Sequence, residues 1–453
     1  MRYLSTRGGR PEADFTDALL NGLAPDGGLY VPEAWPHLSA ETLSGDYGLV
    51  AREVMGAFAG DALSAAAIDR AVSRLLSGFD TPEVTPLLRL SDRLFLLELH
   101  HGPTAAFKDL AMQVAASLTE AALERSGERL TLFVATSGDT GAAAVRAFEG
   151  MDRVRLVVLH PLDRVSSIQR RQMTTATADN ILNLAVEGDF DDCQRLVKQL
   201  LAHETLKADG RISSVNSINW ARLAGQVPYY VVAAEALRRR GVEAAATYVV
   251  PTGNFGDAFA GWVAARMGAA VGGLVAAVNL NDALARALQT GVYARAPANP
   301  TMSVSMDVQA PSNFERLVFE AAGRDPERTR AVFETFTRDG SVTLDDDLLR
   351  RLRDEVSAVS VGEAETAQEM RRTLAETGLI VCPHTAVALA AARRVEAGPV
   401  VALATAHPAK FPEAVKESVH REPPPAWVLE GLIGRPERFT RVKPQLEAVL
   451  AVL

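Results

Sequence analysis

From about residue 130 onward, short apolar runs alternate with longer stretches of helical periodicity, and this alternation constrains the fold more than any other feature. The runs are rich in valine, leucine, isoleucine and alanine, as expected for strands that are buried on both faces. Seven of them cover residues 130–135, 155–160, 181–186, 212–215, 247–250, 274–278 and 400–404. Strands that are separated by helices pair in parallel through βαβ units. The sequence therefore predicts an α/β fold built on mostly parallel sheets.

The first 90 residues follow a different pattern. Helical amphipathicity covers residues 12–23, 49–58 and 65–79, and a turn rich in glycine and proline covers residues 24–32. No strand alternation is visible there. A chain of 453 residues is long enough for two or three domains. We predict a helical region over residues 1–90, a smaller lobe over 91–230 and a larger lobe over 231–453.

Charge and cysteine content argue against several classes of function. The net charge is −9 and the basic residues are scattered, which argues against a surface that binds nucleic acid. The two cysteines, Cys193 and Cys382, are too few for a disulfide framework or a cysteine-rich metal site. We therefore expect a protein of the reducing cytoplasm, with no metal site and no nucleic-acid partner.

Two segments bear on export and membrane insertion. The N-terminus lacks the apolar run of a secretory signal. Residues 258–280 carry only one charged side chain, Arg266, but glycines interrupt the segment, so a buried helix, a turn and a buried strand fit it better than a membrane span. A proline run at residues 423–425 precedes a tail that we expect to be helical and that could pack on either lobe.

Three loops have the composition of anion-binding sites. In α/β folds, ligands bind where strands end and helices begin, because free amides of helix N-termini point there. The loops are TSGDTG at residues 136–141, NSIN at 216–219 and TGNFGD at 252–257, and each follows a predicted strand. Any one of them could be an ordinary helix cap. Together, in an acidic protein without a Walker lysine or a G-x-G-x-x-G pattern, they predict a site for several anionic groups.

Lys108 stands near the start of a helix that we predict over residues 104–124. Its neighbours on that helix are small or apolar: Thr104, Ala105, Ala111, Met112 and Ala115. Burial and the positive end of the helix dipole both disfavour an ammonium, and they favour a neutral amine that can attack an aldehyde. A surface lysine that extends into solvent is the alternative that the spacing leaves open.

Around this lysine, the sequence HGPTAAFKD at residues 101–109 resembles the cofactor-lysine motif of the threonine synthases, which are fold type II pyridoxal-phosphate enzymes. Further segments that resemble the family lie at residues 3–8, 26–32, 137–141, 164–175, 190–194, 216–222, 251–257, 305–316 and 404–413. Several of these motifs separate the family from serine dehydratases and cysteine synthases. The resemblance spans nearly the whole chain, and it implies two open, mostly parallel twisted sheets flanked by helices, with a helical N-terminal region.

The resemblance also implies a reaction. Threonine synthases are lyases that convert O-phospho-L-homoserine and water to L-threonine and phosphate, with pyridoxal 5'-phosphate as cofactor. Phosphate leaves the γ-carbon and water adds at the β-carbon, in the last step of threonine biosynthesis. A related phospholyase that releases 2-oxobutyrate, and a non-catalytic relative that binds the cofactor, are the alternatives. We expect a monomer or a homodimer that binds a small-molecule substrate and no membrane.

The family pattern implies roles for individual residues of this chain. Lys108, rather than Lys410, would bear the cofactor and carry the proton of the substrate α-carbon. The loop around the cofactor phosphate would consist of Gly253, Asn254, Phe255 and Gly256. The substrate carboxylate would be bound by Ser137, Gly138 and Thr140, and the substrate phosphate by Asn216, Ser217 and Arg222. The pyridine nitrogen would face the neutral hydroxyl of Thr385, which favours elimination and replacement chemistry over transamination.

Four polar residues near these positions leave alternatives open. Asp139 would repel a carboxylate in its loop, so we expect it to face the phenolic oxygen of the cofactor or the amides of its own helix. Thr385 could instead be the N-cap of a helix. His384 and His407 each lie beside a proline, where a histidine that is hydrogen-bonded to backbone is at least as common as a general base.

Overall fold

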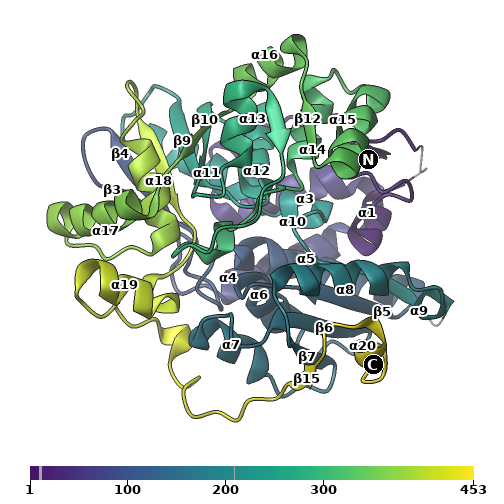
Figure 1. Ribbon diagram of the computed structural model, residues 1–453. Helices are drawn as coiled ribbons and strands as arrows, with labels where there is room; N and C mark the ends of the chain where they lie inside the picture. The colour runs from purple at the N-terminus through teal and green to yellow at the C-terminus, as the bar shows by residue number, and fades with distance from the viewer. Residues whose placement is uncertain (10–12, 209) are drawn as a thin grey trace.

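The computed structural model describes residues 1–9, 13–208 and 210–453, and it has two open sheets (Figure 1). The larger sheet has the strand order β13-β10-β9-β14-β4-β3, and the smaller has the order β15-β7-β6-β5-β8. Neighbouring strands of both sheets pair in parallel except β3 and β4. In Figure 1, the larger sheet lies in the upper part of the molecule and the smaller sheet in the lower part.

The strands are short and are defined by their residue ranges. Those of the larger sheet are β3 (Leu87–Arg89), β4 (Leu94–Glu98), β9 (Ala246–Pro251), β10 (Val271–Val278), β13 (Ser357–Ser360) and β14 (Val400–Ala404). Those of the smaller sheet are β5 (Leu130–Ala135), β6 (Val154–Pro161), β7 (Ile181–Val186), β8 (Arg211–Ser213) and β15 (Thr440–Val442). Two antiparallel pairs lie apart from them, β1 (Tyr3–Ser5) with β2 (Tyr30–Pro32) and β11 (Val292–Ala294) with β12 (Ser341–Thr343).

Helices surround the sheets. The N-terminal region contains α1 (Phe15–Asn21), α2 (Ala40–Leu43), α3 (Tyr47–Ala59), the 3-10 turn η1 (Gly60–Ala62) and α4 (Ala65–Ser77). The middle of the chain contains α5 (Lys108–Ser126), α6 (Asp139–Phe148), α7 (Ser167–Thr174), α8 (Phe190–Ala202), α9 (Glu204–Ala208), α10 (Trp220–Ala224) and α11 (Val227–Arg239). The four N-terminal helices begin after side-chain caps, namely Asp14, Ser39, Asp46 and Ser64.

The remaining helices come after the strand β9. They are α12 (Gly256–Arg266), α13 (Ala283–Thr290), α14 (Phe314–Ala321), α15 (Pro326–Asp339), α16 (Asp346–Glu355), α17 (Glu363–Thr377), α18 (Pro383–Ala392), α19 (Pro412–Val419) and α20 (Leu446–Leu450). Three single 3-10 turns accompany them, η2 (Val304–Met306), η3 (Pro408–Lys410) and η4 (Trp427–Leu429). The predicted α/β fold with two mostly parallel sheets is therefore confirmed.

All seven predicted strands are present, and three of them, β5, β7 and β14, have the predicted bounds. The prediction that the first 90 residues contain no strand is wrong, because β1 and β2 pair there and β3 lies at the end of the region. Strands of three residues are too short to show alternation in the sequence. β4 was missed because a lone apolar run cannot be told from part of a helix. The domain boundaries at residues 90 and 230 stay predictions.

The apolar segment at residues 258–280 forms most of α12, a turn and β10, as predicted, and it is largely buried. Within the described ranges, no helix is both long enough and apolar enough to cross a membrane. The expectation of a helical tail is wrong for most of its length. After the prolines at 423–425 the chain is mainly irregular, because glycines and further prolines interrupt it. Its strand β15 pairs with β7, so the tail packs on the smaller sheet.

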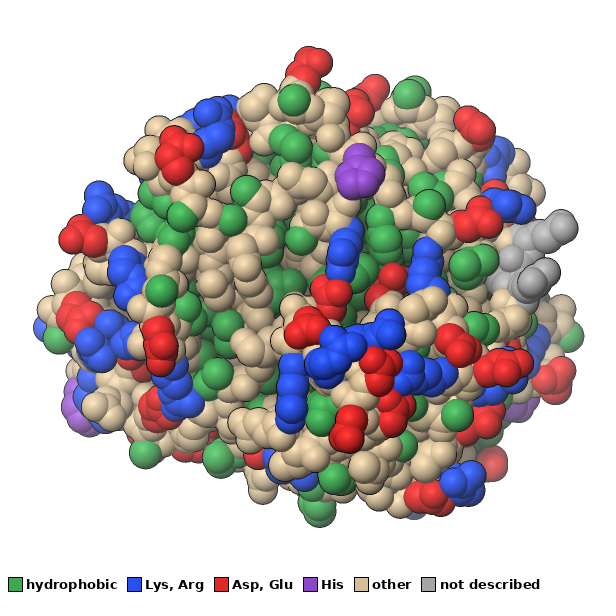
Figure 2. All heavy atoms as spheres, turned by 90° about the horizontal axis from the view of Figure 1, so that it is seen from above, with side chains coloured by type: hydrophobic (Ala, Val, Ile, Leu, Met, Phe, Trp, Pro, Cys, Tyr) green, Lys and Arg blue, Asp and Glu red, His purple; other side chains and the backbone are tan. Residues whose placement is uncertain are grey.

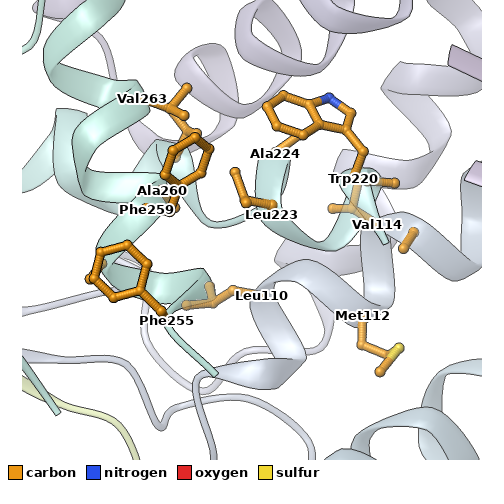
Figure 3. Close-up of a cluster of buried hydrophobic side chains, with 14 of the residues drawn as sticks. Leu110, Met112, Val114, Trp220, Leu223, Ala224, Phe255, Phe259, Ala260 and Val263 are labelled. Carbon is orange, nitrogen blue, oxygen red and sulfur yellow. The ribbon is translucent and has the colours of Figure 1, made fainter. Parts of the chain in front are cut away.

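Three helices near the centre of the molecule share one hydrophobic core (Figure 3). The labelled side chains come from α5, α10 and α12 and from the residue before α12: Leu110, Met112, Val114, Trp220, Leu223, Ala224, Phe255, Phe259, Ala260 and Val263. The helices approach closely at Gly225, where an added Cβ would lie 2.9 Å from the Cα of Ala111. Because interiors are close-packed, the starts of these helices are held in fixed positions relative to one another.

Charged side chains do not gather by sign on the face drawn in Figure 2, where acidic and basic groups stand side by side. Many of them form ion pairs within one helix, such as Arg350 with Asp347 and Asp354 on α16. A mixed surface of this kind supplies no extended positive field for a polyanion.

Replacing Phe259 by alanine tests whether the shared core holds these helices. The Phe259 side chain is fully buried and stacks on Trp262 with ring centroids 5.2 Å apart. We expect the Phe259→Ala variant to lose about 3–5 kcal/mol of unfolding free energy, read as a lower midpoint of urea unfolding. The control is Ile433→Ala, because Ile433 is 76% exposed and its loss should cost under about 0.5 kcal/mol. Equal midpoints for the two variants would contradict the packing described.

Candidate active site

The helix that carries Lys108 begins at this lysine, four residues later than predicted. The carboxylate of Asp109 accepts hydrogen bonds from the backbone N–H and the hydroxyl of Thr104, at 2.8 and 2.7 Å. Ala105 has a positive φ of 56°, which breaks helical geometry. The backbone N–H of Phe107 donates to the carbonyl of Thr405, next to the strand β14. These bonds keep the preceding loop out of the helix and hold Lys108 at its first turn.

The Lys108 side chain is mostly buried, with 13% of its surface exposed. Its Nζ lies 3.5 Å from Oδ2 of Asp139 and 4.6 Å from the centroid of the Phe107 ring. Burial lowers the pKa of Lys108; the charges of Arg222 and Lys410 lower it too, while Asp139 raises it. The net shift is downward, as predicted for an amine that must lose its proton to react.

Asp139, the first residue of α6, is the centre of a buried polar cluster. Its Oδ1 lies 2.8 Å from Nζ of Lys410 and accepts a hydrogen bond from Nε2 of Gln169 at 2.9 Å. Its Oδ2 accepts one from the Ser305 hydroxyl at 3.0 Å. Burial alone would raise the pKa of Asp139, but the ammonium groups of Lys410 and Lys108 hold it well below its usual range. Asp139 is therefore a carboxylate between two lysines, not a cap of its own helix.

The loop before α12 lies against the loop that carries Ser305. A Cβ added at Gly253 would lie 2.8 Å from the Ser305 carbonyl oxygen, so only glycine fits there. Phe255 has a positive φ of 64° and stands at the N-cap of α12 without a side-chain cap among the described residues. The first amides of α12 are therefore free to bind an anion, and the helix dipole favours one.

The loop before α6 has a similar build. Gly138 has a φ of 137°, and a Cβ there would lie 2.4 Å from the Gln169 side chain. The hydroxyl of Thr136 accepts hydrogen bonds from the backbone N–H groups of Gly138 and Gly141, which shapes the turn through Ser137 and Thr140. Within the described part of the chain, α6 has no side-chain cap either. Its N-terminus is a second position that suits an anion.

Arg222 lies on α10 and is 2% exposed. Its Nη1 donates to the carbonyl of Val215 at 2.8 Å, and its Nε makes no hydrogen bond to the described residues. Oδ1 of Asn216 is also buried without a partner there. Burial lowers the pKa of Arg222 to about 10, so it stays charged at neutral pH. A buried charge with an unused donor points to an anionic ligand, because an unpaired buried ion is costly.

Asn313 and Arg316 join two of these loops. Nδ2 of Asn313 donates to the carbonyls of Ser217 and Asn254, at 3.1 Å each. Arg316 is fully buried, binds Oδ1 of Asn313, and donates from Nη2 to the carbonyl of Ile218 at 2.7 Å. Its Nε donates to the carbonyl of Tyr30 in β2 at 3.0 Å. The loops at residues 216–219 and 253–256 are thus fastened to each other and to the N-terminal region.

The polar side chains around Thr385 are hydrogen-bonded to other groups of the protein. Thr385 lies inside α18, whose N-cap is Cys382, so it is not itself the N-cap; its hydroxyl lies 3.3 Å from the sulfur of Cys382. Nε2 of His384 accepts from the Ser305 backbone N–H at 3.1 Å, and burial lowers the pKa of His384 to about 4. His407 caps η3 through the N–H of Ala409. Both histidines therefore accept hydrogen bonds from backbone amides.

The site contains residues to which the sequence gave no role. Lys410 is the foremost of them, because it was predicted only as a loop lysine that does not bear the cofactor. Ser305 and Asn313 lie in family-like segments, but nothing in their type or spacing distinguishes them from ordinary polar residues. The flanking Ala409 and Phe411 were the one local sign that Lys410 is buried.

These residues fit pyridoxal phosphate. Lys108 supplies a buried amine of lowered pKa for its aldehyde, and the uncapped start of α12 behind Gly253 suits its phosphate. The hydroxyl of Thr385 is the neutral group that the prediction placed at its ring nitrogen. The Nε–H of Arg222, which has no partner among the described residues, is a further donor that suits a second anionic group.

Comparison with known proteins identifies the family. Three family profiles match: "Pyridoxal-phosphate dependent enzyme" over residues 79–406, "Threonine synthase N terminus" over 2–75 and "Threonine synthase, C-terminal" over 385–453. The threonine synthase of Pseudomonas aeruginosa is 40% identical, over 100% of this chain and 97% of its own.

Two solved structures extend the comparison. The crystal structure of pyridoxal-phosphate-bound threonine synthase from Brucella melitensis has a TM-score of 0.95 at 44% identity, over 100% of this chain and 98% of its own. Threonine synthase from yeast has a TM-score of 0.93 at 31% identity, over 99% of this chain and 97% of its own. The predicted family, fold type and cofactor are confirmed. The chain belongs to the threonine synthases, lyases of the pyridoxal-phosphate-dependent enzyme family.

Proposed function

We propose that this chain converts O-phospho-L-homoserine and water to L-threonine and inorganic phosphate, with the cofactor bound through Lys108. One observation carries the proposal: a buried amine of lowered pKa lies within electrostatic reach of a buried guanidinium, and among the described residues this guanidinium has an unused donor and the starts of α6 and α12 have no side-chain cap. The substrate has a carboxylate, an amine and a phosphate. The two anions of the substrate and the phosphate of the cofactor match the three loops.

Lys108 is preferred to Lys410 because of the hydrogen bonds of the two amines. Nζ of Lys410 is fully buried, lies 2.8 Å from Asp139 and donates to the carbonyl of Thr104, also at 2.8 Å. The hydrogens of this amine are therefore already donated to fixed acceptors. In the part of the chain that the structure describes, the one acceptor near Nζ of Lys108 is Asp139, at 3.5 Å, which is outside normal hydrogen-bond length. Lys108 is therefore the amine that can lose its proton and attack an aldehyde.

The binding residues hold the substrate by its ends. Ser137, Gly138 and Thr140 offer amides and hydroxyls at the start of α6 to the carboxylate. Arg222, with Asn216 and Ser217 beside it, offers charge-assisted hydrogen bonds to the phosphate. Gly253, Asn254, Phe255 and Gly256 form the cradle for the cofactor phosphate. Holding both ends fixes the carbon chain of the substrate beside Lys108, which lowers the entropic part of the barrier.

The cofactor, when bound, supplies an electron sink that makes the protons next to the substrate amine acidic. Lys108 then has the role of taking the proton from the α-carbon and returning one to it. A second proton must leave the β-carbon before phosphate can depart from the γ-carbon. Arg222 balances the charge of the departing phosphate and keeps the ion in place. Phosphate has a second pKa of about 6, so the retained ion can itself carry protons.

Compartment, assembly and domain boundaries complete the proposal. The described cysteines, Cys193 and Cys382, are both free and buried, which suits the reducing cytoplasm.

We propose a monomer or a homodimer, and light scattering on the purified protein measures which of the two forms. The helical region over residues 1–90 and the lobes over 91–230 and 231–453 remain our division of the chain. Limited proteolysis tests that division.

Borohydride reduction of the protein loaded with pyridoxal phosphate identifies the cofactor lysine. We expect peptide mapping to find the pyridoxyl group on Lys108 and none on Lys410, because only the Lys108 amine is free of fixed acceptors. Lys108→Ala should abolish the label, whereas Lys416→Ala, a change at an exposed lysine, should leave it unchanged. A pyridoxyl group on Lys410 would overturn the assignment.

Replacing Arg222 by alanine tests the substrate phosphate site. We expect the absorbance of bound cofactor to persist and the KM for O-phospho-L-homoserine to rise about 10- to 100-fold, since a hydrogen bond to a charged group contributes roughly 1.5–3 kcal/mol. Arg350→Ala is the control, because Arg350 lies on the exposed face of α16. If Arg222→Ala instead loses the absorbance of the bound cofactor, Arg222 binds the other phosphate.

The reaction itself is tested by its products. The protein with pyridoxal phosphate and O-phospho-L-homoserine should release phosphate and threonine in equal amounts, because retained donors favour capture of water over escape of an intermediate. In deuterated water, the threonine should carry deuterium at the α- and γ-carbons, measured by mass spectrometry. If 2-oxobutyrate is the main product and threonine is scarce, the chain is a phospholyase. Absence of both products would indicate a non-catalytic relative.

A further inference from the structure

The chain uses lysine sparingly, with six lysines among its 47 basic residues. Four of them are exposed: Lys198, Lys207, Lys416 and Lys443. The other two, Lys108 and Lys410, lie against the same carboxylate, that of Asp139. The cofactor needs only one lysine. The second lysine at this place therefore needs a separate explanation, because the chain otherwise prefers arginine.

Lys410 is fixed from several sides. Its ammonium has two acceptors at 2.8 Å, Oδ1 of Asp139 and the carbonyl of Thr104 in the loop before Lys108. Its own carbonyl accepts from the Ser166 hydroxyl at 3.2 Å, at the start of α7. Its backbone N–H donates to the carbonyl of His407. None of its side-chain surface is exposed, so its ammonium is paired with protein groups in the interior and not with solvent.

The charge balance of the site depends on this lysine. A carboxylate that is as buried as Asp139 is stable only beside a cation. Lys108 cannot be that cation throughout a reaction in which its nitrogen gives up and takes back protons. Without Lys410, each loss of a proton by Lys108 would leave Asp139 as an unpaired buried anion. With Lys410 present, one ammonium always remains on the carboxylate.

We propose that Lys410 is a positioning residue of the active site, whose permanent ammonium holds Asp139 as a carboxylate and so lets the Lys108 nitrogen lose its proton. This inference rests on the proposed function, because it takes Lys108 as the cofactor lysine. Lys410 acts on Lys108 through Asp139 and through its own charge. It need not touch the substrate for either effect.

Other titratable groups face this trio and must be considered in any titration of it. They are Arg222, Asp109, Asp257, Cys382, His384 and His407. Burial lowers the pKa of His384 and of His407 to about 4, so both are neutral above pH 6. Arg222, whose pKa burial lowers to about 10, stays mostly charged below about pH 9, and burial raises the pKa of the Cys382 thiol, which stays protonated there. Asp109 and Asp257, each with a pKa raised to about 6 by burial, are largely ionised above pH 7. A titration between about pH 7 and pH 9 therefore reports mainly on the trio.

The test is the pH dependence of the absorbance of the bound cofactor, measured above pH 7 without substrate. In Lys410→Met, the Asp139 carboxylate has lost its second cation. Removing the proton from the Lys108 nitrogen would then leave the carboxylate unpaired. We expect the midpoint of the titration to rise by about one pH unit or more. In Asp139→Asn, the midpoint should move in the opposite direction, since the anion that favours the proton is gone. Lys416→Met, at an exposed lysine of α19, should titrate like the unchanged protein.

The outcomes separate a positioning role from a merely structural one. If Lys410 only fills space, Lys410→Met lowers the unfolding midpoint and leaves the absorbance midpoint where it was, which overturns the proposal. If Lys410→Met fails to bind the cofactor, the double variant Lys410→Met with Asp139→Asn provides the second measurement. Removing both charges should restore cofactor binding, because an unpaired buried carboxylate destabilises the site more than a neutral amide does. A double variant that fails like the single one also overturns the proposal.

Failure of this inference can be told apart from failure of the proposed function. Borohydride mapping of the unchanged protein decides whether Lys108 bears the cofactor, whatever the titrations give. If the label lies on Lys108 and the midpoint of Lys410→Met does not move, only the role of Lys410 is wrong. If the label lies on Lys410, both assignments are wrong.

Discussion

Parallel strands that end at the same edge of a sheet are the constraint on which the site depends. The helices α5 and α12 follow strands of the larger sheet, and α6 follows a strand of the smaller one. Each helix therefore begins at an edge where strands end, and its first amides face the same region. The common core of α5, α10 and α12 fixes the distances between these starts. Arg316 and Asn313 then join the loops, so that the chain's own hydrogen bonds hold these helix starts near Lys108 and Arg222.

Electrostatics decides which of the buried groups can react. Asp139 lies between two lysines, and its two contacts differ: Lys410 lies at 2.8 Å and is fixed, whereas Lys108 lies at 3.5 Å and is held less tightly. Burying three ionisable groups is costly, and the attraction between their opposite charges offsets this cost only when hydrogen bonds are also present. Gln169, Ser305 and the Thr104 carbonyl supply those bonds. The strained backbone at Ala105 and Phe255 accompanies this arrangement, at the two loops that deliver Lys108 and the start of α12.

The sequence predicted what depends on local pattern and missed what depends on distant contacts. Apolar runs predicted seven strands of the two sheets, because a buried parallel strand is visible in its composition without its partner. The strands β1, β2 and β15 were not foreseen, since three residues carry no period. The helix at Lys108 starts late because of the bonds of Asp109 to Thr104, which spacing does not reveal. Lys410 was placed in a loop, as its neighbours suggest, but its burial results from packing against segments roughly 300 residues away in sequence.

The scarcity of lysine has a consequence for how the chain tolerates an aldehyde cofactor. A free aldehyde forms adducts with any uncharged amine it meets, and lysine side chains at a surface supply such amines as the pH rises. A guanidinium keeps its charge and does not compete. With four exposed lysines and arginine carrying most of the surface positive charge, this protein offers few sites for unwanted modification. Excess pyridoxal phosphate should therefore form few adducts with the surface of this protein.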